Sequence, residues 1–350
     1  MTLKQYRELL ARGNKNARKV QRLFDDATKE IERIIRGGSG GTISMRRHID
    51  EVVKRLNSNV YKVIQQGLDV EIQSADLHTD ELTRKILASL SAPKVVYNYS
   101  NEVQNARNSG WQAFRQEHTR SLSERVWNIT DQFHRQVDDI LNLSFSQGES
   151  ANKTAQSLKP FLKEPDKLFR RVRNAEGDLV LSKAAKAFHP GRGVYRSSVQ
   201  NARRLARNET NDMYRSREHD RQEPLPWVVG FTINLSNNHT SRGPNGKLIP
   251  GWRDMCDDLI GDYPKWFKWR GWHVNCRCFK TPILCPIEEM QAIMRQISQG
   301  EQPSPSKSNI EALPPQFVSW IQGNIGRLQS YRSTPYFLQD NHEEIMRAIN

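Results

Sequence analysis

Hydrophobic positions in the first half of the chain recur at helical spacing. Apolar side chains in residues 49–64 follow one another at steps of three and four: Ile49, Val52, Val53, Leu56, Val60, Val63 and Ile64. Residues 126–141 show the same spacing: Val126, Ile129, Phe133, Val137, Ile140 and Leu141. One narrow apolar stripe is typical of an amphipathic helix that packs against other helices. We therefore predict an antiparallel helical bundle over residues 1–145 that docks on a partner.

Polar and glycine-rich breaks separate the predicted helices. The segment Arg36–Gly41 (RGGSGG) reads as a flexible loop. A second break spans Ser146–Ser150 (SQGES), and Ser150 is placed to cap the helix that follows, ANKTAQSLKPFL. The stretch RNAEGDLV further along predicts a hairpin turn, and a long helix is expected from Ser197 to Arg221.

The hydrophobic period changes from helical to alternating at Trp227. In the segment WVVGFTINL every second side chain is apolar, which predicts a strand with one buried face. An aromatic segment that carries all the cysteines follows at Trp252–Cys285, then a Ser/Pro linker at Gly300–Asn309. The final residues predict a helix and an aromatic docking segment.

These elements predict a mainly α fold with a small α+β module. The order is a helical N-terminal half, a long helix, a short sheet and a Cys/His-rich clip. We place the module at residues 146–290, and a linker with a helical and aromatic tail at residues 291–350.

Charge is concentrated in two blocks. The 350-residue chain has a net charge of +14: residues 1–70 carry +7, residues 158–221 carry +8, and the rest of the chain carries −1. Such blocks predict an anionic partner such as nucleic acid, although a solvated helix face is an equal alternative because acidic residues are interleaved. The arginines weighed as DNA or partner contacts are Arg170, Arg171, Arg173, Arg203, Arg204 and Arg207.

The sequence shows no signal peptide and no apolar run of membrane-spanning length. We expect a soluble protein made in a cytoplasm, where thiols stay reduced. All four cysteines (Cys256, Cys276, Cys278 and Cys285) fall in one short window. Clustered cysteines in that compartment indicate a metal site before a disulfide.

A tetrahedral zinc site is the metal centre that this window suggests. Zinc prefers thiolate and imidazole ligands, and His273, Cys276 and Cys278 are close enough in sequence to converge. Cys256 would complete the site if the segment GDYP, read as a turn at Gly261–Pro264, folds the chain back. Cys285 is an alternative ligand, most plausibly in place of His273. Four protein ligands leave no position for water, which favours a structural zinc over a catalytic one.

Other interpretations of these residues remain open. The thiols are equally explained as small buried core residues among tryptophans. A Cys–His nucleophile pair would need further groups that the sequence does not show. Asp254, Asp257 and Asp258 lie near the cysteines and suggest a metal-dependent nuclease, although a solvated acidic turn explains them better.

Three motifs in order resemble a known family. The long helix carries Arg207-Asn208-Glu209-Thr210, Cys256 precedes Leu259 and Gly261, and HVNCRC follows at His273–Cys278. This arrangement resembles the phage Mu protein F-like family, also called the phage head morphogenesis or minor head protein family. The resemblance covers residues 140–285. The family usually has a proline where Val274 stands, and Asn208 interrupts its Arg-Thr-Glu element.

The resemblance implies a minor structural protein of a tailed-phage or prophage head. Such a protein is associated with the portal, is involved in head morphogenesis or DNA delivery, and contains a Cys/His motif regarded as a metal site. Its expected location is the virion, in the head interior or portal region, after synthesis in the host cytoplasm. We expect portal or other capsid proteins as partners, with phage DNA as a further one. No small-molecule substrate and no enzymatic activity are evident, and a DNA-binding virion protein or a metal-dependent hydrolase or nuclease are the alternatives.

Overall fold

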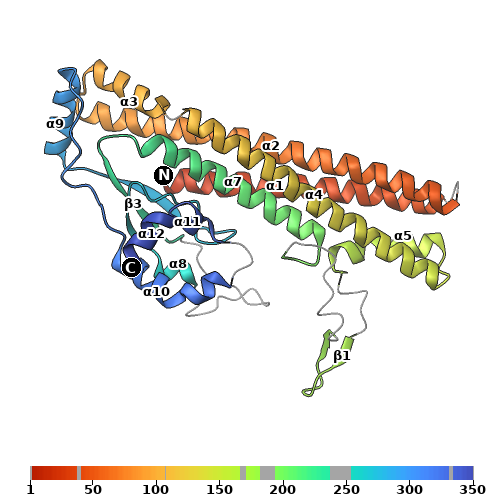
Figure 1. Ribbon diagram of the computed structural model, residues 1–350. Helices are drawn as coiled ribbons and strands as arrows, with labels where there is room; N and C mark the ends of the chain where they lie inside the picture. Colours follow the sequence, from red (N-terminus) through yellow and green to blue (C-terminus); the bar gives the residue numbers. More distant parts are fainter. Residues whose placement is uncertain are drawn as a thin grey trace. The chain divides into compact units, whose positions relative to one another are not determined.

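The computed structural model describes residues 2–37, 41–106, 108–165, 171–181, 194–236, 254–330 and 334–349. This described part is mainly helical and contains two small β-sheets, which confirms the predicted fold class (Figure 1). None of its helices combines the length and apolarity needed to cross a membrane. The chain divides into two compact units. Unit 1 comprises residues 1–11, 68–113 and 211–350, and unit 2 comprises residues 12–67 and 114–210.

Long helices supply residues to both units. They are α1 (Leu3–Gly37), α2 (Gly41–Ser89), α4 (Asn108–Ser146) and α7 (Ser198–Gln222). The predicted stripes at residues 49–64 and 126–141 lie inside α2 and α4, and nearly all of their apolar side chains are buried. Helix α7 matches the long helix expected after Ser197. Helical periodicity therefore locates these elements correctly.

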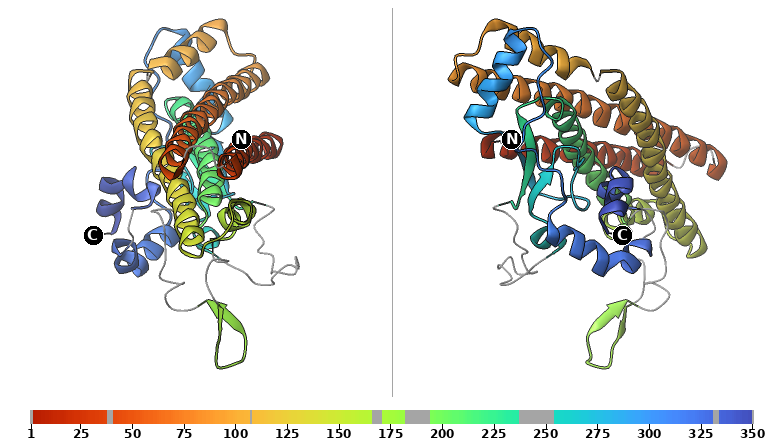
Figure 2. Two further views of the ribbon diagram at one scale, coloured as in Figure 1. Left: turned by 90° about the vertical axis from the view of Figure 1, so that its right-hand side faces the viewer. Right: turned by 60° about the vertical axis from the view of Figure 1, so that its left-hand side comes forward.

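Unit 2 is held by contacts among its helices, which run beside one another in two views (Figure 2). The ring of Phe24 on α1 meets that of Phe133 on α4 edge to face, with centroids 5.3 Å apart. Between α2 and α4, the Asn57 amide donates to the Thr130 hydroxyl over 2.8 Å. The predicted cap of α5 (Ala151–Lys163) is confirmed, since the Ser150 side chain accepts a bond from a backbone N–H in the first turn.

The predicted hairpin is also confirmed. Strands β1 (Arg171–Arg173) and β2 (Leu179–Leu181) pair antiparallel around the turn. Within that turn the Asn174 side chain accepts a bond from the Asp178 backbone over 2.7 Å. Gly177 has φ +88°, which a residue with a side chain rarely adopts.

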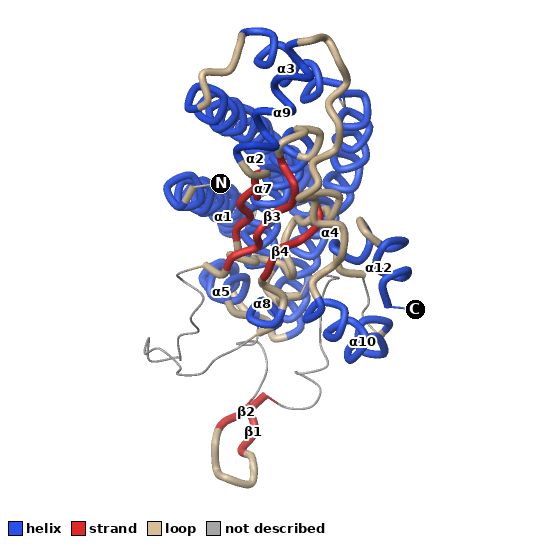
Figure 3. The backbone as a smooth tube through the Cα atoms, turned by 90° about the vertical axis from the view of Figure 1, so that its left-hand side faces the viewer, coloured by secondary structure: helices blue, strands red, loops and turns tan. Residues whose placement is uncertain are grey.

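Unit 1 contains an antiparallel sheet whose strands follow the order β4-β3-β5, with β4 at Gly261–Pro264. Strands β3 and β4 are labelled in Figure 3. The central strand β3 (Val228–Asn234) confirms the predicted strand, and β5 comprises Phe279–Leu284. The expectation of one buried face is wrong, because Val228 and Val229 are both buried. The pairing of β3 with β5 has a bulge between Val228 and Gly230, which interrupts the alternation of side chains, and a later segment of the chain also approaches the strand here. The backbone N–H of Ile310 donates to the Val229 carbonyl over 3.0 Å, so this segment lies against the strand.

The turn predicted at Gly261–Pro264 is wrong, because these residues form strand β4. Tyr263 pairs with Phe231 of β3, and its ring is fully buried. Its hydroxyl also donates to the Leu259 carbonyl over 2.8 Å. Burial of this aromatic side chain and pairing with β3 outweigh the turn preference of Gly and Pro. The sheet, rather than a turn, therefore returns the chain toward Cys256.

The remaining helices are α3 (Lys94–Ala106), α8 (Met255–Asp258), α9 (Ile287–Ser298), α10 (Pro315–Gln329), α11 (Tyr336–Gln339) and α12 (His342–Ile349). The predicted linker is anchored, since the hydroxyls of Ser306 and Ser308 both donate to the Glu289 carboxylate. The tail forms α10 and buries Phe337, as predicted. The predicted module ends at residue 290, and residues before and after this position share one core. The predicted domain boundaries stay a prediction.

Candidate metal centre

Cys256 lies on the short helix α8, whose start is fixed by its own side chains. The carboxylate of Asp254 accepts a bond from the Cys256 backbone N–H over 2.7 Å. The Asp257 carboxylate accepts in turn from the Asp254 backbone over 2.8 Å. This reciprocal arrangement is a capping box, which satisfies free N–H groups of the first turn. Two of the acidic residues that sequence alone left open to a nuclease role, Asp254 and Asp257, thus fix the start of the helix that carries Cys256.

Cys276 and Cys278 lie in the loop that leads into β5. Gly271 opens this loop with φ +129°, and a Cβ atom there would come within 2.8 Å of the Arg215 guanidinium. Asn275 adopts φ +61°, and the Cys276 backbone donates to the His273 carbonyl over 3.0 Å. Asparagine tolerates this left-handed conformation better than most residues. The chain reversals at Gly271 and Asn275 direct the thiols of Cys276 and Cys278 toward Cys256.

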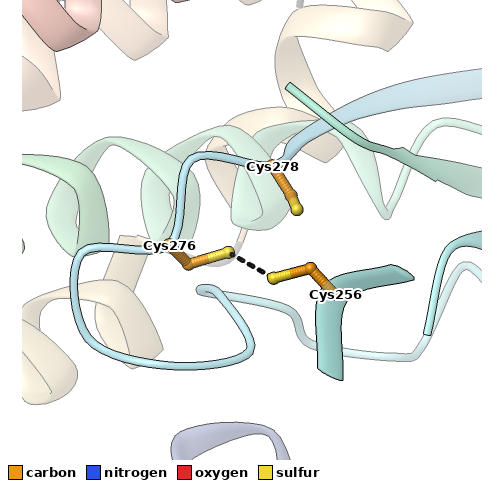
Figure 4. A group of neighbouring side chains, drawn as sticks. All are labelled: Cys256, Cys276 and Cys278. Carbon is orange, nitrogen blue, oxygen red and sulfur yellow. Dashed lines mark hydrogen bonds between the residues drawn. The ribbon is translucent and has the colours of Figure 1, made fainter. Parts of the chain in front are cut away.

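The three thiols form one buried group (Figure 4). The Sγ atoms of Cys256 and Cys276 are 3.8 Å apart, and all three sulfur atoms lie within 4.8 Å of one another. A tetrahedral zinc ion with zinc–sulfur bonds of about 2.3 Å would hold two sulfur atoms about 3.8 Å apart. The cluster of Cys256, Cys276 and Cys278 could therefore hold a metal ion. Its residues are at most 1% exposed.

His273 lies at the solvent side of this group. Its Nε2 atom is 3.1 Å from the Cys256 sulfur and 3.3 Å from the Asp254 carboxylate. Its Nδ1 atom is 2.9 Å from the Val274 carbonyl, which can only accept a hydrogen bond. That contact assigns the proton to Nδ1 in the neutral ring and leaves the Nε2 lone pair on the side of the Cys256 thiol. Asp254, Cys256 and His273 form a second set with ligand atoms within 4.8 Å of one another.

Arg215 of α7 holds the cysteine loop from the other side. Its guanidinium donates to the carbonyls of Arg270 (2.9 Å), Cys276 (2.9 Å) and Cys278 (2.7 Å). It also lies over the Trp269 ring, 4.6 Å from the centroid. A planar cation with several donors is suited to this fork of acceptors. Arg215 therefore fixes the backbone of both loop cysteines and adds positive charge beside their sulfur atoms.

The thiols differ in their tendency to ionise. Burial opposes ionisation of Cys276, but hydrogen bonds from Cys256 and Cys278 and the charge of Arg215 hold its pKa well below the usual value. Hydrogen bonds with Cys276 and Cys278, together with burial, raise the pKa of Cys256. Cys276 is thus the thiol of this group that ionises most readily, and Cys256 holds its proton more strongly. Metal binding releases the protons of the thiols that become ligands.

An aromatic core surrounds the cysteines. Trp272 packs edge to face on Phe337 with centroids 5.3 Å apart, and both belong to the buried cluster that contains the three thiols. The C-terminal segment is fixed there by charge, since Arg270 binds the Asp340 carboxylate through two bonds of 2.7 and 3.0 Å. Arg270 also contacts the buried Asp212 of α7. The tail is therefore part of the structure that encloses the centre.

The other predicted site residues lie elsewhere. Cys285 packs in a different core cluster, where its backbone donates to the Trp227 carbonyl, and burial raises its pKa to about 11. It is not part of either potential ligand set found among the described residues. The arginines Arg203, Arg204 and Arg207 are half-buried on α7. Arg173 is exposed and donates to the Gly177 carbonyl, while Arg170 and the side chain of Arg171 lie outside the described residues.

A second buried polar group lies on α7 in unit 2. The Glu209 carboxylate, fully buried, accepts bonds from Arg125 (2.5 and 3.0 Å) and lies 2.6 Å from Nε2 of His118. Burial alone would raise the pKa of Glu209, but the bond to His118 and the charge of Arg125 hold it below the usual value. This carboxylate therefore joins α4 to α7. The sequence indicated Glu209 only through the family motif, and neither partner carried a signal.

Sequence reasoning missed Arg215 because α7 contains many arginines and no local pattern distinguishes the one that turns inward. Residues 209–219 of α7 are all buried, so no single stripe of the helix marks Arg215 as the side chain that faces the cysteine loop. Comparison of the chain with protein-family models, curated proteins and solved structures gives no match, so the interpretation of the centre depends on its own geometry and chemistry.

Proposed function

We propose that Cys256, Cys276, Cys278 and His273 bind one zinc ion. The observation that carries this proposal is the 3.8 Å separation of two buried sulfur atoms, which suits a tetrahedral zinc site. Thiolate and imidazole ligands favour zinc over calcium or magnesium, which prefer oxygen. The Nε2 lone pair of His273 supplies the imidazole donor, and the nearby Arg215 offsets the charge of the thiolates.

The zinc ion has a structural role in this proposal. Four protein ligands leave no open position at which water could be activated. The thiols also lie inside the aromatic core that includes Trp272 and Phe337. The ion would tie α8 to the loop before β5, two segments joined otherwise through the sheet. A catalytic zinc, as the hydrolase alternative requires, would instead keep a position for substrate or water.

We further propose that the chain is a minor structural protein of a phage head that binds portal or capsid proteins. Its support is the way two of the family-like motifs meet. Cys256, from the second motif, contacts both His273 and Cys276 of the HVNCRC motif. Arg215, on the helix that carries the first motif, binds the loop backbone. Motifs that converge in one module favour a shared structural purpose over chance similarity.

Metal analysis with hydrogen exchange tests the zinc proposal. We expect about one equivalent of zinc in the purified chain. Its binding should be as tight as is typical of structural zinc sites. Removal by a chelator should increase amide exchange in α8 and residues 271–278 by several orders of magnitude. Exchange around Glu209 should change little, because that group has no thiol. A zinc-loaded protein that retains a water ligand and hydrolyses phosphodiesters would instead support the catalytic alternative.

Matched variants locate the ligands. The double change Cys276→Ser/Cys278→Ser should abolish zinc binding and mimic the chelated state. Cys285→Ser removes an equally buried thiol from a different core cluster and should retain the zinc. If the wild type carries no metal, or if both variants lose it equally, the proposed ligand set is wrong.

Particle composition tests the phage-head proposal independently of zinc. Mass spectrometry of purified particles from the phage or prophage that encodes the chain should detect it in few copies. Crosslinking should connect it to portal or capsid protein. Its absence from purified particles would contradict the proposal even if the zinc site is correct.

A further inference from the structure

Helix α1 has two different faces within unit 2. Its buried face carries Asn16, Val20, Phe24, Ala27, Ile31 and Ile35 at steps of three and four. That face meets its neighbours through Phe24 against Phe133 on α4 and through the Asn16 amide, which donates to the Thr210 hydroxyl of α7 over 3.2 Å. The α2 backbone approaches closely at Gly67, where a Cβ would come within 2.5 Å of Asn16. Packing therefore occupies one side of α1.

The opposite side carries a dense set of cations, which we call the basic face: Lys15, Arg18, Lys19 and Arg22. All four side chains are exposed, and the sequence from Arg12 to Phe24 contains no acidic residue. At about 1.5 Å of rise per residue, the four cations occupy only about 10 Å of helix. Among the described residues, none of the four has an acidic partner, in contrast to Lys29, which pairs with Asp26.

The second basic block differs in its exposure. Arg217 and Arg221 are 6% and 7% exposed and bind the carboxylates of Asp76 and Asp80. Arg203 and Arg207 are half-buried. The charges of Arg217 and Arg221 are therefore internal and neutralised. The charge on the basic face of α1 remains available to a partner.

The composition of the basic face selects among anionic partners. From Arg12 to Gly37, α1 shows no large exposed apolar side chain among its described residues. A helix that binds at a membrane surface needs such side chains to insert, and a protein interface needs an apolar or aromatic centre. Single-stranded nucleic acid is typically held by stacking on aromatic rings, and the α1 aromatic ring in unit 2, that of Phe24, is buried. Among its described residues, the basic face has neither exposed large apolar side chains nor exposed aromatic rings. Its rigid row of cations suits the regularly spaced phosphate charges of a DNA duplex.

We propose that the basic face of α1 binds the phosphate backbone of double-stranded DNA without reading its sequence. The cations neutralise phosphates and release their counterions, so affinity falls with salt. Each contact contributes about 0.9 to the slope of log affinity against log salt, which gives about 3.6 for the four cations. This inference depends on neither the zinc ion nor the family resemblance.

Fluorescence anisotropy of a labelled duplex, titrated with the full chain at several salt concentrations, tests the proposal. The variant Lys15→Gln/Arg18→Gln/Lys19→Gln/Arg22→Gln should lower the slope by about 3 to 4 and the affinity by at least tenfold at low salt. The control variant Lys94→Gln/Lys159→Gln/Arg295→Gln/Lys307→Gln removes the same charge at exposed positions elsewhere. It should retain most of the slope. Circular dichroism establishes that both variants are folded.

Several results would overturn the proposal. One is the absence of salt-dependent duplex binding by the wild type. Another is an equal loss in both variants, which would assign binding to net charge rather than to this face. Equal or tighter binding to single-stranded DNA, to polyglutamate or to anionic lipid vesicles would assign the face to a different partner. None of these results would affect the zinc content or the particle composition.

Discussion

Two buried charges on α7 are stabilised in different ways. Glu209 is bound by Arg125 and His118, two side chains of the already formed helix α4. Arg215 is surrounded by carbonyls of the loop that carries Cys276 and Cys278. The first is an ion pair between two formed helices. The second is a charge that gives shape to a loop with few backbone bonds of its own.

The comparison separates charges that join elements from charges that create a site. Loss of Glu209 should leave both helices formed but joined less tightly. Loss of Arg215 should release the loop, and with it the positions of two proposed zinc ligands. Stability and metal affinity should therefore respond differently to changes at these positions.

The largest effect is expected from Glu209→Gln. This change leaves Arg125 and His118 next to a neutral amide in a buried site. Breaking a buried ion pair on one side costs about 3–5 kcal/mol, so we expect that decrease in the free energy of unfolding. Urea denaturation measures it, with zinc content unchanged. The exposed pair of Glu343 and Arg347 provides a control, because Glu343→Gln should cost about 1 kcal/mol or less. Equal costs in both variants would contradict the interpretation.

Compared with Glu209→Gln, the change Arg215→Lys should destabilise the protein less and weaken zinc binding more. Lysine keeps the charge but cannot reach three carbonyls with a planar fork. We expect a loss of about 2–3 kcal/mol, as for one or two hydrogen bonds to a charged group, and a decrease in zinc affinity of about 10–100-fold, as for supporting residues around metal ligands. Competition with a chromogenic chelator measures the affinity.

Arg217→Lys is the matched control for this change. Arg217 is a buried arginine of the same helix that binds Asp76 and Asp220 rather than the cysteine loop. The Arg217→Lys variant should be less stable than the wild type but should bind zinc with the same affinity. If Arg215→Lys binds zinc as tightly as the wild type, the loop keeps its shape without that arginine.

The smallest effect is expected on acidification. Because the pKa of Glu209 is lower in the folded chain than its ordinary value of 4.5, the unfolded chain binds more protons in the window just below that pH. The contribution of Glu209 is complete above pH 4.5 and is lost as pH falls through the folded pKa. The stability difference between wild type and Glu209→Gln should therefore shrink in acid. Urea titrations at neutral pH and below pH 4.5 measure it, and a constant difference would exclude the assignment.

Local patterns predicted the elements that depend on local physics. The stripes of α2 and α4 were found from their period, the cap at Ser150 from its hydroxyl, and strand β3 from alternation. The prediction failed where distant residues decide the outcome. Gly261–Pro264 becomes a strand because Tyr263 is buried, and the alternation of β3 fails where its pairing with the distant strand β5 bulges between Val228 and Gly230.

The candidate site shows the same division. Sequence proximity grouped all four cysteines, yet β5 separates Cys285 from the other three by carrying it into the core around Trp227. The contribution of Arg215 requires knowledge of which side of α7 faces the loop. The orientation of His273 depends on its bond to the Val274 carbonyl, which no residue pattern specifies.

The enclosure of the cysteines by Phe337 and Ile345 has a consequence for biosynthesis. Translation proceeds from the N-terminus, so Cys256, Cys276 and Cys278 leave the ribosome before the residues that complete their aromatic cover. The nascent chain therefore passes through an interval in which its thiols are open to solvent. That interval is the time when an ion enters most easily, and it is also when an oxidant or a misplaced thiol does the most harm.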